Sequence, residues 1–479
     1  MIDYSMVDFG GIDSADGITE EEGALIRSLV DVFNDRLSNN LTRLEYYEDK
    51  NKLKNIGLNI PNGFDAKVNT AIGWCAKACD YLAARSVFDG FTASDGVEDE
   101  LQRIFEENDF NAEYEKAKPS QLTFGIGFWT VSRGAPGEQS VVVNYHNAIS
   151  AAALWDYRHK RVKAGFVIED YELVRTGGKE TYRPCFVVMH TDEAVVEFER
   201  NGCCWKATRK QHSMGRPLMV AMPFRPMDTK PLGKSRISPA CMAITDEMQR
   251  EVMRTSLHSE VFSSGQKAVL GASDEQYDAL VGSKFRAAMT DMLVMTRDEN
   301  GEVPQVTQFA QQSMEPHVKA IELCMSRMAA ETSIPVAAYG LSSNGYTSTD
   351  ALRASSDDLV LEAETMNAQN QKALVEVARL ALATSRNETV DLTKKEYMGI
   401  SVHWRDPSNP SMASISDAMM KQATVIGWIA ETDVFLEKLG YSEDERIRLL
   451  REKDAAKAAT TMAFALTGGE PAAVTDDAD

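Results

Sequence analysis

The sequence predicts an α+β fold, in which helices and a β-rich segment form one domain and further long helices follow it. Changes in the hydrophobic period indicate this order. Residues 19–118 carry apolar side chains at helical spacing, and from Gln121 to about Phe224 the period is two, as in strands. The helical period then returns. A chain of 479 residues has material for about three domains.

The first part of the chain supplies both layers of the expected domain. Residues 1–18 are rich in Gly, Asp and Ser and carry no predicted element. Residues 20–37 and 69–88 give the clearest amphipathic helices of the first layer. The predicted strands are GFWTVS, SVVVNY, GFVIEDYEL, CFVVMH and the hairpin AVVEFE-RNG-CCWKAT.

Two long helices flank a small β-containing insert in the middle of the chain. The first follows PLGKSRIS (Pro231–Ser238) and runs to Phe262, and the second begins near Met314. The insert, Ser263–Gln312, contains a predicted hairpin whose Glu299-Asn300-Gly301 supplies the turn. Two antiparallel helices with an insert at their far end are expected to form a stalk with a tip.

The longest predicted helix follows a polar loop. The preceding helix stops before Pro335, the loop Gly340–Tyr346 follows, and Ser348 or Thr349 is the expected cap of the new helix. No Pro or Gly occurs from Asp350 to about Arg386, so a helix on the order of 55 Å is possible. Its apolar seam repeats every seven residues, at Leu352, Leu359, Met366, Ala373 and Leu380. This pattern indicates a structural beam rather than an active-site element.

The C-terminal region is predicted to be a separate helical part. SVHWRDPSNPS (401–411) is a Pro-rich boundary, and helices are expected near Ser414–Ile429, Glu431–Leu439 and Ser442–Leu466. Residues 468–479 form an acidic tail of the composition typical of disorder.

Composition excludes some classes of protein. The formal charge is −21, from 72 acidic and 51 basic residues, so tight binding to the nucleic-acid backbone is disfavoured. Solubility is the plain explanation of the acidic excess, and composition does not separate it from a functional use of the charge. Seven scattered cysteines indicate free thiols in a reducing cytoplasm. Neither a secretory signal nor a membrane span is predicted.

Apparent catalytic and metal motifs are weak. Gly233-Lys234-Ser235 imitates the end of a phosphate-binding loop, but that loop needs a Gly at position 228, which is Asp here. A turn leading into the next helix is the better interpretation. Cys75 and Cys79, four residues apart on a helix, are expected to be buried packing thiols. Cys203-Cys204 cannot both face one zinc ion from a strand. We therefore expect no catalytic residue, no cofactor and no metal.

Several stretches together resemble one protein family, the portal proteins of tailed bacteriophages of the siphophage type. They occur in the family's order: LTRLEYYEDKNKL (41–53), TAIGWCAKACDYLAARSVFDGF (70–91), LQRIFEENDFNAEYEKAKPSQLTFGIGFWTVS (101–132), MPFRPMDTKPLGKSRIS (222–238) and ETSIPVAAYGLSSNGYTSTDALRASSDDLVLEAE (331–364). None is diagnostic alone, but their order and separation over most of Leu41 to Ala383 make the resemblance strong.

The resemblance implies a portal-type fold. Residues 1–237 and 333–400 would be the α/β wing, 238–262 and 313–332 the two-helix stem, 263–312 the small α/β clip, and 401–479 the helical crown with its tail. It also implies a ring, commonly a homo-dodecamer, at one capsid vertex. That ring would conduct double-stranded DNA with transient contact, and would dock the terminase large subunit, a head–tail connector, and the major capsid and scaffolding proteins. The alternative is a nucleotide-dependent enzyme based on the Gly233-Lys234-Ser235 motif.

The resemblance also implies two sets of site residues, and the carboxylates of the long helix suggest a third. Residues 340–349, before the long helix at 350–386, would be a loop facing the channel and DNA, although a plain surface loop remains the alternative. The loop residues are Gly340, Ser342, Ser343, Asn344, Gly345 and Tyr346. The clip would contact its partners through Arg297, Asp298, Glu299 and Asn300. Asp357, Asp358 and Glu362 would form an acidic channel-lining or solvated helix face.

Overall fold

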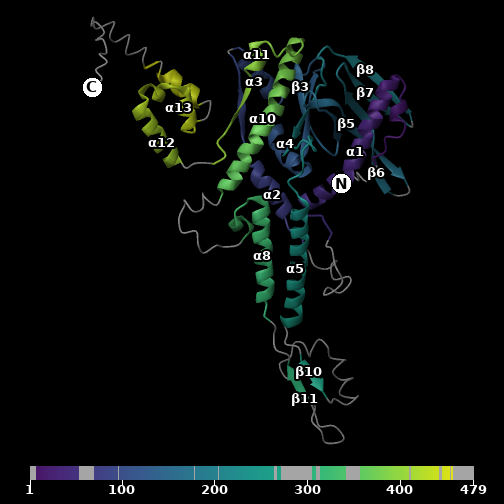
Figure 1. Cartoon of the computed structure of the whole chain (residues 1–479), viewed down its shortest axis with the longest axis vertical. Helices are drawn as coiled ribbons and strands as arrows, with labels where there is room; N and C mark the ends of the chain where they lie inside the picture. The colour runs from purple at the N-terminus through teal and green to yellow at the C-terminus, as the bar shows by residue number, and fades with distance from the viewer. Residues whose placement is uncertain are drawn as a thin grey trace. The chain divides into compact units, whose positions relative to one another are not determined.

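The chain divides into two compact units, Met1–Pro407 and Ser408–Asp479. The computed structural model describes residues 7–52, 70–94, 96–176, 179–202, 204–263, 267–270, 305–308, 313–340, 356–408, 412–441, 445–453 and 455–456. The first unit combines helices with β-sheets, and the described part of the second is helical. The chain is thus a mixed helix-and-sheet protein, as its periods predict (Figure 1).

An antiparallel sheet of five strands forms one side of the first unit. Its order follows the sequence, β4-β5-β6-β7-β8. The strands are β4 (Ala151–Asp156), β5 (Arg161–Thr176), β6 (Lys179–His190), β7 (Ala194–Asn201) and β8 (Cys204–Gln211). The turn between β7 and β8 contains Gly202 with a φ of 65°, the left-handed conformation that glycine adopts without strain. Strand β4 was not predicted.

Helix α1 (Glu20–Tyr47) packs on this sheet (Figure 1). It begins with a capping box, in which the Glu22 N–H donates to the Thr19 hydroxyl at 3.3 Å and the Glu22 carboxylate accepts from the Thr19 N–H at 2.9 Å. The Phe33 ring lies 5.5 Å from that of Phe166 on β5. The buried side chains Ile26, Leu29, Phe33 and Leu37 recur at helical spacing. They fix the face of α1 that meets the sheet.

A second sheet has three strands in the order β3-β2-β9. The strands are β2 (Ile126–Arg133), β3 (Val141–Asn147) and β9 (Met219–Pro223). Helices α3 (Val97–Glu107) and α4 (Phe110–Phe124) contribute to the core on this sheet, around the fully buried Trp129. Strand β9 was not singled out from the sequence.

Helix α4 extends beyond the predicted end of the helical part at residue 118. It contains Pro119 and continues to Phe124, where Gly125 ends it with a φ of 85°. Gln121 is fully buried, and its side chain donates to the Met222 carbonyl at 3.2 Å. Tertiary contacts therefore keep these residues helical, and the predicted change to strand at Gln121 was placed too early.

A short two-stranded sheet was missed by the sequence analysis. Strand β1 (Phe88–Thr92) pairs with β12 (Ser401–Trp404), although the first was predicted as helical and the second as part of a boundary. The Phe88 and Trp404 rings pack edge to face, 6.1 Å apart. Because the two strands are short and far apart in sequence, neither has enough residues to show a period of its own.

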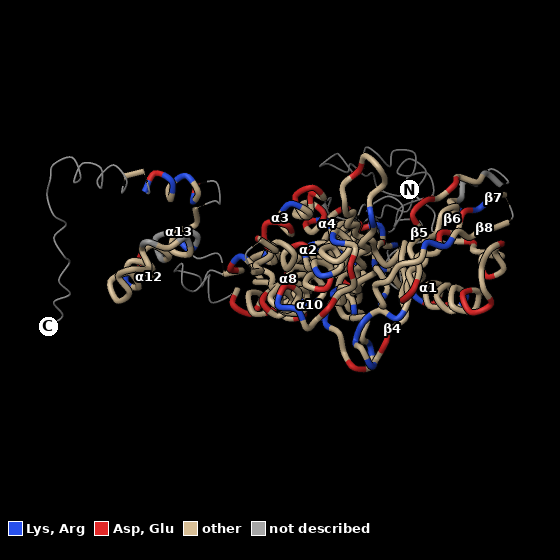
Figure 2. Tube along the Cα trace, turned by 90° about the horizontal axis from the view of Figure 1, so that it is seen from above, with Lys and Arg blue, Asp and Glu red and all other residues tan. Residues whose placement is uncertain are grey.

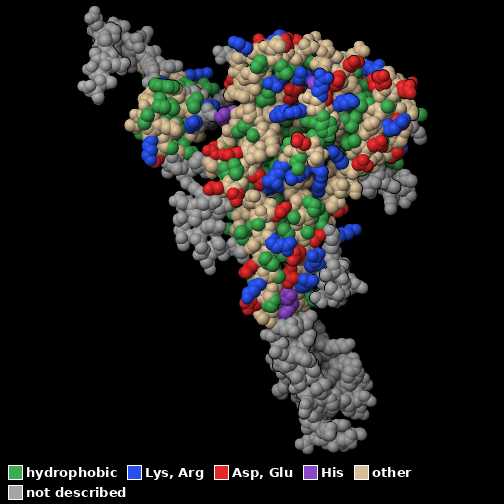
Figure 3. Space-filling model, viewed as in Figure 1, with side chains coloured by type: hydrophobic (Ala, Val, Ile, Leu, Met, Phe, Trp, Pro, Cys, Tyr) green, Lys and Arg blue, Asp and Glu red, His purple; other side chains and the backbone are tan. Residues whose placement is uncertain are grey.

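Helices α5 (Pro239–Ser263) and α8 (Glu315–Thr332) lie side by side below the sheets in Figure 1. They correspond to the two predicted long helices around the insert. Near the end of α5, His258 Nδ1 and His317 Nε2 lie 3.2 Å apart, and histidine side chains are visible at that end in Figure 3. These two rings join the end of one helix to the start of the other.

Only two segments of the insert are described. Strand β10 (Lys267–Leu270) pairs antiparallel with β11 (Gln305–Gln308). In the predicted hairpin, the strand that contains β11 pairs with residues near 292–296. Those residues and the predicted turn Glu299-Asn300-Gly301 lie outside the described residues. The described partner of β11 is therefore a strand that was not predicted.

Helix α10 (Asp357–Arg386) crosses the first unit and joins two of its cores. Its first half packs in the core shared with α2 (Trp74–Ala83), α5 and α8, and its second half packs on the three-stranded sheet. It has 30 residues and begins at Asp357 after Ser356, not at Asp350. The expected caps Ser348 and Thr349 lie outside the described residues. The described members of the predicted seam, Leu359, Met366, Ala373 and Leu380, are all buried.

The C-terminal unit contains α12 (Met412–Val425), a 3₁₀ turn at Gly427–Glu431 and α13 (Asp433–Lys438). The predicted helix Ser414–Ile429 therefore ends early, before Gly427, which interrupts it. Residues 445–453 are helical, whereas the predicted tail 468–479 lies outside the described residues. Large apolar side chains are exposed on this unit, including Met420, Val425 and Trp428.

Candidate functional site

Most of the predicted channel-loop residues and all of the predicted clip residues lie outside the described residues. Gly340 is the exception. It follows the 3₁₀ helix η3 (Val336–Tyr339) and has a φ of 97°, a conformation that favours glycine. Ser342, Ser343, Asn344, Gly345 and Tyr346 lie outside the described residues, as do Arg297, Asp298, Glu299 and Asn300.

The predicted acidic face of the long helix is divided by the structure. Asp357 and Asp358 are exposed in the first turn of α10. Glu362 is buried, with only 9% of its surface accessible, so its prediction as part of a channel-lining or solvated face is wrong. Its carboxylate accepts from two guanidinium groups, those of Arg225 and Arg236. Two cations close by make burial of this charge possible.

Arg236 is the centre of a polar junction between α2, α8 and α10. Its guanidinium is buried and donates to the Ala78 carbonyl on α2 at 2.6 Å and to the Thr332 carbonyl on α8 at 2.6 Å. It also forms the ion pair with Glu362 on α10. Thr332 is the last residue of α8, so a cation here neutralises the negative end of that helix. Arg236 lies just before α5, which begins at Pro239. The start of α5 therefore meets three other helices at this point.

The segment from α8 to Gly340 is fixed to the same junction. The hydroxyls of Thr332 and Tyr339 lie 2.8 Å apart. The Tyr339 ring packs edge to face on Trp74, with centroids 5.5 Å apart, and the Lys77 ammonium donates to the Ala338 carbonyl at 2.5 Å. The chain therefore approaches the predicted loop from a rigid base on α2.

The Gly233-Lys234-Ser235 motif forms a turn before α5, as expected. Gly233 has a φ of 77°, and a Cβ there would lie 2.4 Å from the Gly125 carbonyl oxygen. The Ser235 hydroxyl donates to the Thr123 carbonyl at 2.6 Å. This glycine is required by close packing of two backbone segments, and the serine holds the turn to the end of α4.

The expected packing thiols are confirmed at Cys75 and Cys79, both fully buried. The Cys75 sulfur lies 3.4 Å from the Thr245 hydroxyl, and burial raises the pKa of the Cys75 thiol to about 12. Burial also raises the pKa of Cys79. Cys203 lies outside the described residues, and Cys204 is exposed. Across the described ranges, no cluster of His, Cys, Asp and Glu is arranged to hold a metal ion.

The junction was not predicted from the sequence. In the sequence, Arg236 is only part of the stretch before the first long helix, and Glu362 is one of several acidic residues on the last. The one available signal was an acidic side chain within the apolar positions of a long helix. Within the described part of the chain, no helix combines the length and apolar character needed to span a bilayer.

Comparison with known proteins shows which family the chain belongs to. The family described as phage portal protein, SPP1 Gp6-like, matches residues 26–459. The portal protein of Mycobacterium phage L5 is 24% identical over 457 residues, covering 91% of this chain and 90% of the relative. That of Mycobacterium phage D29 is 24% identical over 443 residues, covering 89% and 88%.

Solved structures of gene transfer agent (GTA) particles are also similar to this chain. The neck of an empty particle, computed with C6 symmetry, gives a TM-score of 0.43 at 15% identity over 82% of this chain and 94% of that one. The native virion gives a TM-score of 0.42 at 15% identity over 86% and 98%.

The family match covers most of the chain, including most of the residues of the three hydrophobic cores in the first unit. The protein is therefore a structural protein of phages, built around long helices. It belongs to the SPP1 Gp6-like family of phage portal proteins, and the resemblance noted in the sequence is confirmed.

Proposed function

We propose that copies of this chain form a dodecameric ring at one vertex of a phage capsid and line the channel for DNA packaging and ejection. The family match over residues 26–459 carries this proposal. The ring would dock the terminase large subunit and the head–tail connector, and would contact the major capsid and scaffolding proteins during assembly. It would need no cofactor and would hydrolyse no nucleotide.

The division into wing, stem, clip and crown is part of the proposal. The wing would comprise residues 1–237 and 333–400, the stem α5 and α8, the clip residues 263–312, and the crown residues 401–479. The pairing of α5 with α8 supports the stem, and the pairing of β10 with β11 at the ends of the insert supports a separate clip. Arg297–Asn300 would lie at the docking end of that clip.

The loop at 340–349 would face the channel and touch passing DNA. Two observations support this role. The loop connects the junction at Thr332–Tyr339 to the start of α10, and Asp357 and Asp358 are exposed there. Acidic side chains beside a loop without Lys or Arg favour weak contact with phosphate, so DNA can slide.

The buried junction at Arg236 would couple movement of the stem to movement of α10. A displacement of α8 moves the Thr332 carbonyl, which Arg236 holds together with Glu362 of α10. The start of α10 and the loop before it would then move with the stem. Such coupling requires a contact with discrete arrangements rather than simple proximity.

Native mass spectrometry tests the ring directly. We expect a species of about twelve times the 53.0 kDa chain mass, and annular particles with a central hole by negative-stain microscopy. A stable monomer as the sole species at micromolar concentration would contradict the proposal. ATP hydrolysis by the purified ring would instead support the nucleotide-dependent enzyme.

Replacing Gly345 by Pro tests the loop. The substitution restricts the backbone of the loop and should leave ring assembly unchanged while DNA packaging or retention falls. Unchanged packaging by assembled Gly345→Pro rings would favour the plain surface loop.

A further inference from the structure

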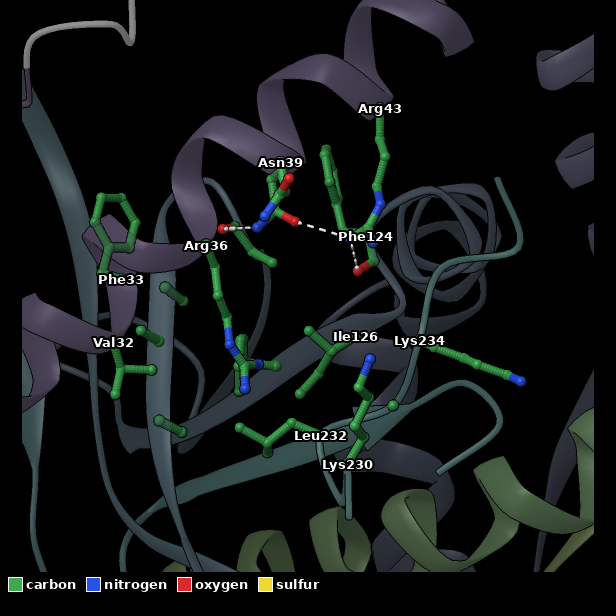
Figure 4. A pocket seen from close by; sticks show the side chains of 17 residues that line it. Val32, Phe33, Arg36, Asn39, Arg43, Phe124, Ile126, Lys230, Leu232 and Lys234 are labelled. Carbon is green, nitrogen blue, oxygen red and sulfur yellow. Dashed lines mark hydrogen bonds between the residues drawn. The ribbon is translucent and has the colours of Figure 1, made fainter. Parts of the chain in front are cut away.

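A basic pocket lies beside the second half of α1. The cavity has a volume of about 220 Å³ and is bounded by α1, by β2 and by the turn at 230–234. Figure 4 shows Arg36 and Lys230 pointing into it from opposite walls, with Arg43 at its edge. Phe124 and Ile126 form part of an apolar wall. Arg36 and Arg43 are seven positions apart and therefore share one face of α1.

These three cations have no acidic partner in the described part of the subunit. Among the described residues, no carboxylate forms an ion pair with Arg36, Arg43 or Lys230. Arg43 is half-buried and donates to two neutral oxygens, Asn40 Oδ1 at 3.3 Å and the Phe124 carbonyl at 3.5 Å. Desolvation and the positive charge of Arg36 lower the pKa of Arg43. Desolvation also lowers that of Arg36, against the opposite effect of Asp35.

Such a set of cations is suited to an anion from outside the subunit. A partly desolvated guanidinium gains most from a carboxylate or phosphate, because charge-assisted hydrogen bonds are stronger than those to neutral oxygens. The chain itself carries 72 acidic residues against 51 basic ones. In a ring of identical subunits, carboxylates of a neighbouring copy are therefore the most abundant anions at close range.

The end of α3 offers carboxylates of the required kind. Glu106 and Glu107 are exposed in its last turn, where there is no basic residue. Negative charge at the C-terminal end of a helix is unfavourable, and no Lys or Arg of the described residues pairs with either side chain. Seen from above, α3 lies on the side of the first unit opposite α1 (Figure 2).

We propose that the pocket lined by Arg36, Arg43 and Lys230 receives the carboxylates of Glu106 and Glu107 from the neighbouring copy of this chain. The inference rests on the proposed ring. A head-to-tail contact between opposite sides of identical subunits is the kind that generates a closed ring. Each subunit would then give its acidic helix end to one neighbour and its basic pocket to the other.

A charge swap tests this contact, with a control from the same turn. Lys230→Glu places a negative charge in the pocket. Lys234 also lines the pocket, but its side chain points away from the cavity (Figure 4), so Lys234→Glu makes the same change outside it. Ring stability is measured as the subunit concentration at which half of the chains are assembled, by sedimentation velocity in about 0.1 M salt. Circular dichroism verifies that each variant is folded.

We expect Lys230→Glu to raise this concentration at least tenfold, and Lys234→Glu to change it less than threefold. Glu106→Lys should weaken the wild-type ring and restore much of the stability of the Lys230→Glu ring, because the new lysine can pair with the new carboxylate while Glu107 keeps the two arginines. Failure of this restoration, or equal effects of the two lysine variants, would overturn the inference.

Two further outcomes separate this inference from its alternatives. If the wild-type chain forms no ring, the proposed function fails before the pocket is tested. If wild-type rings form, and Lys230→Gln weakens binding of a short DNA duplex without affecting assembly, the pocket binds nucleic-acid phosphate. That result would also overturn the contact between subunits.

Discussion

The two halves of α10 are held in place by different forces. In the first half, the buried side chains include Glu362, Asn367 and Asn370, which pair with Arg236, Ser86 and Gln121. In the second half, the buried side chains are almost all aliphatic and pack on the three-stranded sheet: Leu374, Val377, Ala378, Leu380, Ala381 and Leu382. The first half of α10 is thus held by hydrogen bonds and an ion pair, and the second half by apolar packing.

This difference indicates which end can change position. Aliphatic packing is non-directional and is lost gradually, whereas a buried ion pair is favourable only in a defined geometry. The polar half lies next to α8, and the apolar half packs on the three-stranded sheet. We therefore expect the second half to be the fixed reference and the first half to be the element that switches.

The largest expected effect is in the apolar half. Leu380→Ala removes a side chain that is 1% exposed and should lower the free energy of unfolding by about 4 kcal/mol. Urea unfolding followed by circular dichroism at fixed protein concentration measures the change. Leu361→Ala is the matched control on the same helix, because Leu361 is 63% exposed. Equal losses in the two variants would contradict the role of the apolar half as the anchor.

Removal of the Arg236 guanidinium should lower the free energy of unfolding by nearly as much. Arg236→Ala leaves Glu362 with Arg225 alone, and should lower the free energy of unfolding by about 3 kcal/mol. The double variant Arg236→Met with Glu362→Leu should recover much of this loss, because no buried charge then remains unpaired. If the double variant is as unstable as Arg236→Ala, packing rather than charge determines the stability of the junction.

A fall in pH should lower the free energy of unfolding by a smaller amount, through buried histidines on the two larger sheets. Burial lowers the pKa of His146 from its ordinary value near 6.5 to about 4, and burial with two neighbouring histidines lowers that of His190 to about 3. The unfolded chain therefore binds more protons below pH 6.5, and stability falls as the pH drops towards these lowered values. At pH 5.5 His146 should account for about 1 kcal/mol of the loss in the free energy of unfolding.

Urea unfolding of the wild-type protein and of His146→Gln at pH 8 and pH 5.5 checks this dependence. The variant loses the Thr130–His146 contact of 2.9 Å at both pH values, so only the difference between the two pH values is informative. A wild-type difference no larger than that of His146→Gln would exclude His146 as a source of the pH dependence.

The smallest effect is expected at the exposed C-terminal end of α10. Arg386 forms ion pairs with Glu100 and Glu396 at 2.8 and 2.5 Å, but the Arg386 side chain is only partly buried and that of Glu396 is exposed. Arg386→Gln should lower the free energy of unfolding by about 0.5 kcal/mol, and added salt should reduce the difference. A loss comparable to that of Arg236→Ala would show that these partly buried ion pairs are as important as the buried junction.

Sequence reasoning succeeded where one element carries a long periodic pattern. The apolar stripes of α1, α5, α8 and α10 are local properties, so their helices could be predicted. Strands β1 and β12 could not, because Phe88 and Trp404 gain their partners only after folding brings distant segments together. For the same reason α4 continued past residue 118, since Gln121 is held by the Met222 carbonyl on another element.

The site was less predictable than the fold. The sequence predicts Glu362 to lie on an acidic face because other carboxylates lie near it on the long helix, yet its partner Arg236 lies 126 residues earlier. The basic pocket likewise combines Arg36 and Arg43 with Lys230, which belong to separate segments. Charge pairing between distant residues leaves no period in a sequence, so three-dimensional coordinates are needed to see it.

The buried thiols have a consequence for chemical durability. As part of a phage particle, a portal protein meets oxygen from the air. Reaction with oxidants requires the thiolate, and a thiol with a pKa near 12, as at Cys75, is ionised to only about one part in 10⁵ at pH 7. Cys204, in contrast, is exposed on β8. Ageing of stored particles should therefore begin at the outer edge of the five-stranded sheet and spare the helices around Arg236.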